Sequence, residues 1–166
     1  MSCEEERSDD EAISTYQGIA SGKEQERPRN TCTDTQVRCD IYPLQAIGHH
    51  TLHRVHSTHD NNDWLEEAFP QRVFINPIDA AERGINDGDE VKVFNDRGAT
   101  ILPCRVTPRI MPGVIDIPQG AWYDPDENGV DHGGCVNVLT SHKWTPFAFG
   151  TAQHTIMVQI ERIGAR

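Results

Sequence analysis

Short strand-like runs, separated at close intervals by turn-forming residues, restrict most strongly what this chain can fold into. The runs cover residues 90–95, 99–107 and 113–117, and the turn formers before them are Asp87-Gly88, Asp96-Arg97-Gly98 and Pro112-Gly113. Aspartate, proline and glycine favour the tight turns that join neighbouring strands. Strands of this length at this spacing predict a small β-barrel.

Three further strands are predicted around this region. The apolar run "YPLQAIG", residues 42–48, suits a buried strand that ends at its glycine. A second strand is expected over residues 72–75, and "TIMVQIERI", residues 155–163, is expected to be the closing strand. The sequence contains no internal repeat, so the strands belong to one barrel and not to an array.

Short helices are predicted between the strands, which makes the fold mainly β with short helices. In "INPIDAAERGI", Asn76 can cap a helix, Pro77 fits its first position and Gly84 suits a left-handed residue at its end. One or two helical turns are expected around Trp64 and Leu65. Another short helix is expected over residues 136–140.

The chain of 166 residues suits one folded domain preceded by a tail. Residues 1–40 are polar and lack a sustained apolar period, so they are predicted to be a poorly ordered linker or tail. Residues 41–166 are predicted to form the domain. Within the tail, the sequence does not decide whether residues 8–20 form a short helix or whether Cys32 and Cys39 form a disulfide.

The charge and cysteine content exclude several classes of function. A formal net charge of -11 argues against general nucleic-acid binding, which needs a broad basic surface. No apolar run approaches the ~20 residues of a membrane span, so no membrane insertion is expected. The N-terminus "MSCEEERSDDEA" does not resemble a signal peptide, and the localisation of the protein is left open. The five cysteines include no C-x-x-C pair, so neither a disulfide framework nor a thiolate metal site is indicated.

The loop "IGHHTLHRVHST", residues 47–58, holds four of the eight histidines, one arginine and no acidic residue. We interpret it as an anion cradle, because Arg54, the imidazoles and the hydroxyls of Ser57 and Thr58 can all donate to a phosphate. A solvated loop without a function is one alternative. The other is a zinc or copper site, because histidines at 50, 53, 56 and 59 would share one face of a helix.

Two later segments also carry candidate binding residues. "PQGAWYDP" places Gln119 and Gly120 after a strand. In one interpretation these residues contact a ligand; in the alternative, the aromatic residues of the segment pack over the end of the barrel. In "GGCVNVLT" the glycine pair lets the backbone approach a ligand closely. Asn137 can hydrogen-bond a ligand as both donor and acceptor, or it can stabilise the loop by hydrogen bonds within the protein. Cys135 has no neighbouring base, so it is a weak candidate for a nucleophile.

Six blocks together resemble, in order and spacing, the C-terminal molybdopterin dinucleotide-binding domain of the dimethyl sulfoxide reductase family, nearest to its anaerobic catalytic subunits. They are "YPLQAIGHHTLHRVHST", "VFINPIDAAERGINDGDEVKVFNDRGA", "VTPRIMPGV", "QGAWYDP", "DHGGCVNVLT" and "GTAQHT". The resemblance covers residues 42–163. It implies a six-stranded double-psi β-barrel of the aspartate decarboxylase-like type that binds molybdopterin guanine dinucleotide.

The resemblance also implies which residues contact the cofactor. It assigns cofactor binding to Gly48, His49, His50, Arg54, His56, Ser57, Thr58, Gln119, Gly120, Asn137 and Gln153. Among these, His49, His50 and Arg54 would hold the pyrophosphate, and Asn137 and Gln153 would face the pterin or guanine. One departure is Phe149, which stands where relatives commonly carry a lysine.

The implied activity is the reduction of S-oxides or N-oxides by a molybdenum oxidoreductase of which this chain is one domain or fragment, without catalysis of its own. Its implied partners are the remaining domains of the catalytic subunit, an iron–sulfur electron-transfer subunit and a membrane anchor. The molybdenum would be held by the cofactor and upstream domains. Two alternatives stay open: a histidine-rich metal-binding module and a free-standing barrel enzyme. The barrel enzymes of the decarboxylase type generate their pyruvoyl group at a Gly-Ser bond, which this chain lacks.

Overall fold

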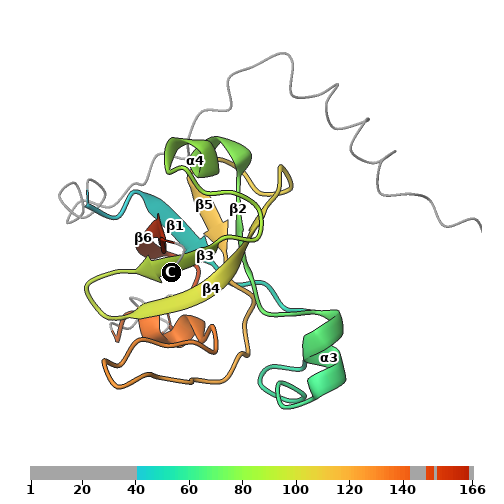
Figure 1. Cartoon of the computed structure of the whole chain (residues 1–166). Coiled ribbons are helices and arrows are strands. Elements are labelled where there is room, and N and C mark those ends of the chain that lie inside the picture. Colours follow the sequence, from blue (N-terminus) through green and yellow to red (C-terminus); the bar gives the residue numbers. More distant parts are fainter. Residues whose placement is uncertain (1–40, 143–148, 152, 165–166) are drawn as a thin grey trace, which may run out of the picture.

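Six short strands form a closed barrel in the computed structural model, which describes residues 41–142, 149–151 and 153–164 (Figure 1). The predictions for residues 1–40 lie outside these ranges. The strands are β1 (Leu44–Ile47), β2 (Val73–Ile75), β3 (Glu90–Phe94), β4 (Ala99–Val106), β5 (Val114–Asp116) and β6 (Ile156–Arg162). Around the barrel they follow the order β1-β5-β2-β4-β3-β6. The prediction of a mainly β fold with short helices and a small barrel is therefore confirmed.

The barrel interior is filled by the alternate residues of each strand. In β3, Val91 and Val93 are fully buried, and in β6 the same holds for Val158 and is nearly so for Ile160. Antiparallel pairing places Val93 directly opposite Ile160. Because side chains of a strand alternate between its two faces, one apolar residue in two suffices to fill a barrel this small.

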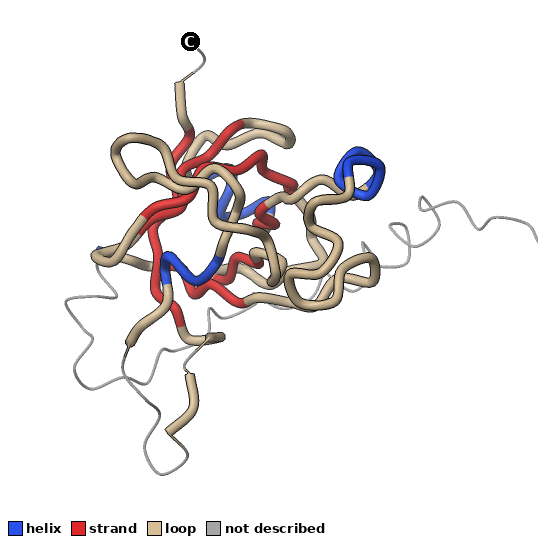
Figure 2. The backbone as a smooth tube through the Cα atoms, turned by 90° about the horizontal axis from the view of Figure 1, so that it is seen from below, coloured by secondary structure: helices blue, strands red, loops and turns tan. Residues whose placement is uncertain are grey.

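Two parallel pairings bring distant parts of the chain together. Strand β1 pairs in parallel with β5, with Ala46 opposite Ile115, and β2 pairs in parallel with β4, with Phe74 opposite Arg105. Parallel strands end at the same edge of a sheet. The loops that follow β1 and β5 therefore leave the barrel side by side. Figure 2 shows the loops of the domain as tan tubes around the red strands.

Within the described ranges, three short helices lie between the strands: α3 (Asp63–Ala68), α4 (Pro77–Glu82) and the 3-10 helix η1 (Val136–Leu139). The predicted cap of α4 is confirmed, because the Asn76 side chain accepts a hydrogen bond from the backbone N–H of Ile78 at 2.9 Å. Gly84, just after the helix, has φ +63° as predicted. Across the described ranges, none of the helices has both the length and the apolar character needed to span a membrane.

Candidate functional site

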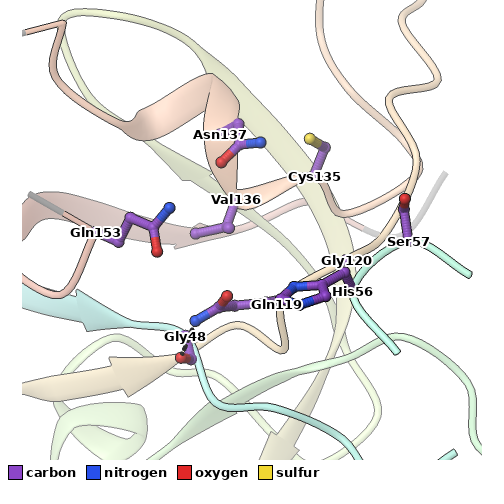
Figure 3. A pocket seen from close by; sticks show the side chains of 9 residues that line it. All are labelled: Gly48, His56, Ser57, Gln119, Gly120, Cys135, Val136, Asn137 and Gln153. Atoms are coloured by element: carbon purple, nitrogen blue, oxygen red, sulfur yellow. Dashed lines mark hydrogen bonds between the residues drawn. The ribbon is translucent and has the colours of Figure 1, made fainter. Parts of the chain in front are cut away.

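A hollow of about 220 Å³ opens where the loops after β1 and β5 meet η1 and the segment before β6. We call it the polar hollow; it is lined by Gly48, His56, Ser57, Gln119, Gly120, Cys135, Val136, Asn137 and Gln153. Figure 3 shows the side chains of Asn137, Gln153 and Gln119 approaching the same space from three different segments.

The floor of the polar hollow is an extension of the β1–β5 pairing. Beyond the two strands, the backbone N–H of Gln119 donates to the carbonyl of His49 at 3.0 Å. The Gln119 side chain then donates from Nε2 to the carbonyl of Gly48 at 2.7 Å. A Cβ atom at Gly48 would lie 2.8 Å from the Gln119 Cγ, so only glycine lets the two segments approach this closely.

The opposite wall is η1, which three side chains fasten to the barrel. Asn95 Nδ2 and Arg97 Nε donate to the carbonyl of Leu139 at 2.9 and 2.8 Å. The carboxylate of Asp131 accepts hydrogen bonds from the backbone N–H groups of Gly134 and Cys135, at 2.9 and 2.7 Å, just before η1 begins. The position of Asn137 is therefore set by contacts made from both ends of its helix.

The lining side chains offer a neutral set of donors and acceptors. The Ser57 hydroxyl and the side-chain amides of Asn137 and Gln153 form no hydrogen bond with any other described residue. Three such groups from separate segments suit a polar ligand with several donor and acceptor edges, since each amide can donate and accept at once. Gly48 and Gly120 leave room for backbone contact with that ligand.

Seven of the eleven predicted cofactor-binding residues meet in the polar hollow, and four do not. The seven are Gly48, His56, Ser57, Gln119, Gly120, Asn137 and Gln153. Of the others, His49 and His50 line a second hollow and Arg54 a third. Thr58 donates its backbone N–H to the carbonyl of Val55 at 2.9 Å, within a turn of the loop. Cofactor contacts of these four residues stay predictions.

Arg54 lies inside the fold and not at the polar hollow. It is 7% exposed, pairs with the carboxylate of Asp60 and donates to Gln71 Oε1 at 2.8 Å. Asp60 also accepts from the backbone N–H of Trp122 at 2.7 Å, and Gln71 donates to the carbonyl of Pro118 at 2.8 Å. In this arrangement Arg54 fastens the loop to the segment that carries Gln119 and Gly120.

The histidines at 50, 53, 56 and 59 do not share a helical face, because residues 48–62 form a loop. His50 packs edge to face against His56, with ring centroids 5.4 Å apart, and His53 stacks on Phe69 at 4.8 Å. Burial and, to a smaller extent, the charge of Arg54 lower the pKa of His53, which favours its neutral ring. Among the described residues, no three His, Cys, Asp or Glu side chains are placed to hold a metal ion.

Several residues that shape the site were not predicted from the sequence. Asp60 and Asp131 position its walls, and Cys135 and Val136 line it. The "DHGG" motif, an aspartate just before two glycines, is the pattern by which Asp131 could have been found. Burial raises the pKa of the Cys135 thiol, which keeps it protonated and agrees with a weak nucleophile.

The structure explains the Gly133-Gly134 pair by packing within the protein, whereas the sequence suggested close approach of a ligand. A Cβ atom at Gly133 would lie 2.0 Å from the carbonyl oxygen of Trp122, and one at Gly134 would lie 2.6 Å from side-chain atoms of Gln71 and Leu102. These glycines therefore allow close packing within the protein. Neither lines the polar hollow.

Two aspartates, one in β5 and one in the exposed turn before η1, are expected to titrate on opposite sides of the ordinary pKa of 3.8. Burial raises the pKa of Asp116, and the His49 ring paired with it opposes that shift. Backbone N–H groups of Val130 and Asn128 lower the pKa of Asp126. Carboxyl NMR over a pH series should therefore give a midpoint above 3.8 for Asp116 and below 3.8 for Asp126.

The consequence for stability has opposite signs at the two positions. A raised pKa means that protonated Asp116 favours the fold, a contribution that is lost as the pH rises through the raised value. A lowered pKa means that ionised Asp126 favours the fold, a contribution that is lost as the pH falls through the lowered value. Equal midpoints for the two carboxyls would contradict this assignment.

The sequence of the chain matches a known protein family over the region that contains the polar hollow. The sequence profile of the molydopterin dinucleotide binding domain matches residues 44–157, which include every residue that lines the hollow. The chain belongs to this family. The resemblance predicted from six sequence blocks is therefore confirmed.

The chain is also similar to characterised oxidoreductases. It is 52% identical over 122 residues to dimethyl sulfoxide reductase DmsA of Escherichia coli, a match that covers 74% of this chain and 15% of DmsA. Over 130 residues it is 41% identical to trimethylamine-N-oxide reductase 1 of the same organism, covering 73% of this chain and 15% of that protein. The chain thus spans about 15% of the length of these relatives.

A solved structure supports the fold of this molydopterin dinucleotide binding domain. Acetylene hydratase from Pelobacter acetylenicus superposes with a TM-score of 0.68 at 18% identity, covering 85% of this chain and 21% of the hydratase. At that identity the likeness concerns the fold only. It agrees with a mainly β domain built on a closed barrel of six strands.

Proposed function

We propose that the chain serves as the molybdopterin guanine dinucleotide-binding domain of a molybdenum oxidoreductase that reduces S-oxides or N-oxides. The observation that carries the proposal is the polar hollow, where Ser57, Asn137 and Gln153 converge without partners among the described residues. Such a set fits the pterin and phosphate edges of the cofactor, which present donors and acceptors. The similarity to the two Escherichia coli reductases supports the substrate class.

The residues of this chain would bind and orient the cofactor. Asn137 and Gln153 would hydrogen-bond its heterocyclic edges, and the Ser57 hydroxyl with the backbone beside Gly48 and Gly120 would contact its phosphates. The bound cofactor itself supplies the metal and the redox chemistry. As further parts of the proposal, the other domains of a catalytic subunit complete the site, and an iron–sulfur subunit and a membrane anchor deliver electrons.

The finer class of the barrel is part of the same proposal. We assign it to the double-psi, aspartate decarboxylase-like type. Two parallel pairings, β1 with β5 and β2 with β4, within an otherwise antiparallel barrel support this assignment. The loops that follow the parallel strands β1 and β5 leave the barrel at the same end, which is where the polar hollow opens.

An Asn137→Ala substitution tests the cofactor proposal. We expect GDP, used as a probe for the guanosine and pyrophosphate part, to shift the backbone amide NMR signals of residues lining the polar hollow. Asn137→Ala should weaken this binding about tenfold, since a hydrogen bond to a neutral or charged ligand group contributes about 1–2 kcal/mol. Amide chemical-shift titration of both proteins provides the dissociation constants.

An Asn128→Ala variant is the matched control, because Asn128 is exposed and lies in a turn where its backbone N–H contacts Asp126. It should bind GDP as the unmodified chain does. If GDP shifts no residue of the polar hollow, or if both variants bind it equally well, the assignment of the hollow to the cofactor is wrong.

A further inference from the structure

Helix α3 lies at the edge of the domain (Figure 1). It has six residues and buries none of them, and both backbone views show it standing away from the barrel (Figures 1 and 2). Isolated helices of this length are unstable in water. A helix this short depends on packing against another surface for its stability, and α3 has an exposed face available for such packing.

Exposed apolar side chains lie on and beside α3, together with the exposed acidic residues Asp63, Glu66 and Glu67 of the helix itself. Trp64 is 76% exposed, Phe69 is 56% exposed, and Leu52 on the neighbouring loop is fully exposed. Leu52 and Phe69 line a hollow of about 400 Å³, which we call the α3 hollow. Single exposed apolar residues are common, but three large ones within 18 residues of sequence, two of them in one concave site, are typical of an interface.

The charge of the α3 hollow is opposite to that of the protein. Its lining includes Arg72, Arg105 and three histidines and no acidic residue, in a chain with a formal net charge of -11. The half-buried Arg72 side chain forms no hydrogen bond or ion pair with any described residue, and Arg105 has only an exposed pair with Asp87 at 3.6 Å. The Thr51 hydroxyl, also in the lining, is buried without a hydrogen-bond partner in the described chain.

We propose that α3 and the α3 hollow form the surface that docks onto the remainder of the molybdenum catalytic subunit. The occupant places apolar side chains against Leu52, Trp64 and Phe69 and an acidic side chain against Arg72. The inference rests on the proposed function, and the length of the relatives supports it, since about 85% of their chain lies outside the part that this domain matches. The remainder of such a subunit is therefore the occupant that the proposal names.

The same loop connects this surface to the cofactor site. Residues 49–53 line the α3 hollow, whereas His56 and Ser57 of the same loop line the polar hollow. Docking at α3 would therefore immobilise a wall of the polar hollow. Docking at α3 is therefore expected to strengthen the binding of the cofactor in the polar hollow.

Site-specific crosslinking identifies the occupant. A photo-crosslinking residue is placed at position 64, first in the full chain alone and then in a chimaera in which residues 44–157 replace the matching segment of Escherichia coli DmsA. We expect no crosslink in the chain alone and a crosslink to the body of DmsA in the chimaera. A matched position is Ile78, which is 55% exposed on α4, away from α3 in Figure 1, and should give no such crosslink.

Charge reversal provides the second measurement. Arg72→Glu should lower the crosslink yield at position 64 at least fivefold, whereas Arg109→Glu, at an exposed arginine outside the α3 hollow, should change it less than twofold. Crosslinks to a second copy or to residues 1–40 in the chain alone would overturn the proposal. So would a chimaera without a crosslink to the body.

Guanine and molybdenum content of the purified chimaera separates the two proposals. A chimaera that holds the cofactor but shows no crosslink to the body contradicts the docking surface and leaves the proposed function intact. A chimaera that shows the crosslink but lacks the cofactor contradicts the proposed function and leaves the docking surface intact.

Discussion

Replacement of Asp131 by alanine is expected to lower the free energy of unfolding by at least about 3 kcal/mol. Asp131 is fully buried, and its carboxylate accepts five hydrogen bonds. Four come from backbone N–H groups, those of Asp124, Gly133, Gly134 and Cys135, and the fifth comes from the Thr100 hydroxyl. Alanine leaves all five donors without an acceptor inside the protein, and each buried unsatisfied donor costs about 1–3 kcal/mol. Urea unfolding followed by tryptophan fluorescence measures the change.

Two further variants keep this prediction testable even if Asp131→Ala does not fold. Thr100→Val removes one of the five donors, a bond of 2.8 Å, and should cost about 1–2 kcal/mol. Asp126→Ala removes another aspartate of the same loop, which accepts backbone N–H groups at an exposed turn, and should cost clearly less than either. An Asp131→Ala protein as stable as Asp126→Ala would show that the buried carboxylate is not the centre of this loop.

The effect of Asp131→Ala should extend to the polar hollow. The carboxylate holds the backbone of Gly134 and Cys135, and η1 with Asn137 begins one residue later. Without this anchor the helix has no fixed starting point, so GDP binding should weaken together with stability. The Thr100→Val variant should retain binding, because the four backbone contacts remain.

The strands were predictable because their determinants are local. The runs at 90–95, 99–107 and 113–117 contain β3, β4 and β5, and each is bounded by the turn residues that the sequence shows. The Asn76 cap and Pro77 likewise act within one turn of α4. The order of the strands was not predictable from such patterns, since the parallel pairing of β1 with β5 joins residues about 70 positions apart.

The candidate site was predicted in part, for a physical reason. Seven of the residues assigned to cofactor binding do meet in one hollow, and six of them are glycine, serine or amide residues of loops and of η1. The prediction for Arg54 rested on the absence of acidic residues from 47 to 58, yet Asp60, two positions further on, pairs with it. Whether an arginine faces a ligand or a carboxylate depends on the folding of the loop, which composition does not reveal.

Replacement of Gly120 by alanine is expected to abolish GDP binding at the polar hollow and to lower the free energy of unfolding by about 2–4 kcal/mol. Gly120 has φ +97°, and a Cβ atom there would lie 1.7 Å from the carbonyl oxygen of His56. Because the obstacle is backbone, the loop 49–62 must move away from residues 118–122. That movement separates Ser57 from Gln119, two walls of the hollow.

Gly129→Ala separates the steric clash from the strain of a positive φ. Gly129 has φ +77°, but a Cβ atom there meets nothing within 4 Å, so alanine should cost only the backbone strain of about 1–2 kcal/mol and leave GDP binding unchanged. The difference between the two variants in urea unfolding gives the contribution of the His56 contact. If Gly120→Ala is no less stable than Gly129→Ala and still binds GDP, the approach of His56 to Gly120 does not shape the site. If it is less stable and binds no GDP, the contact between these two loops holds the hollow in its binding geometry.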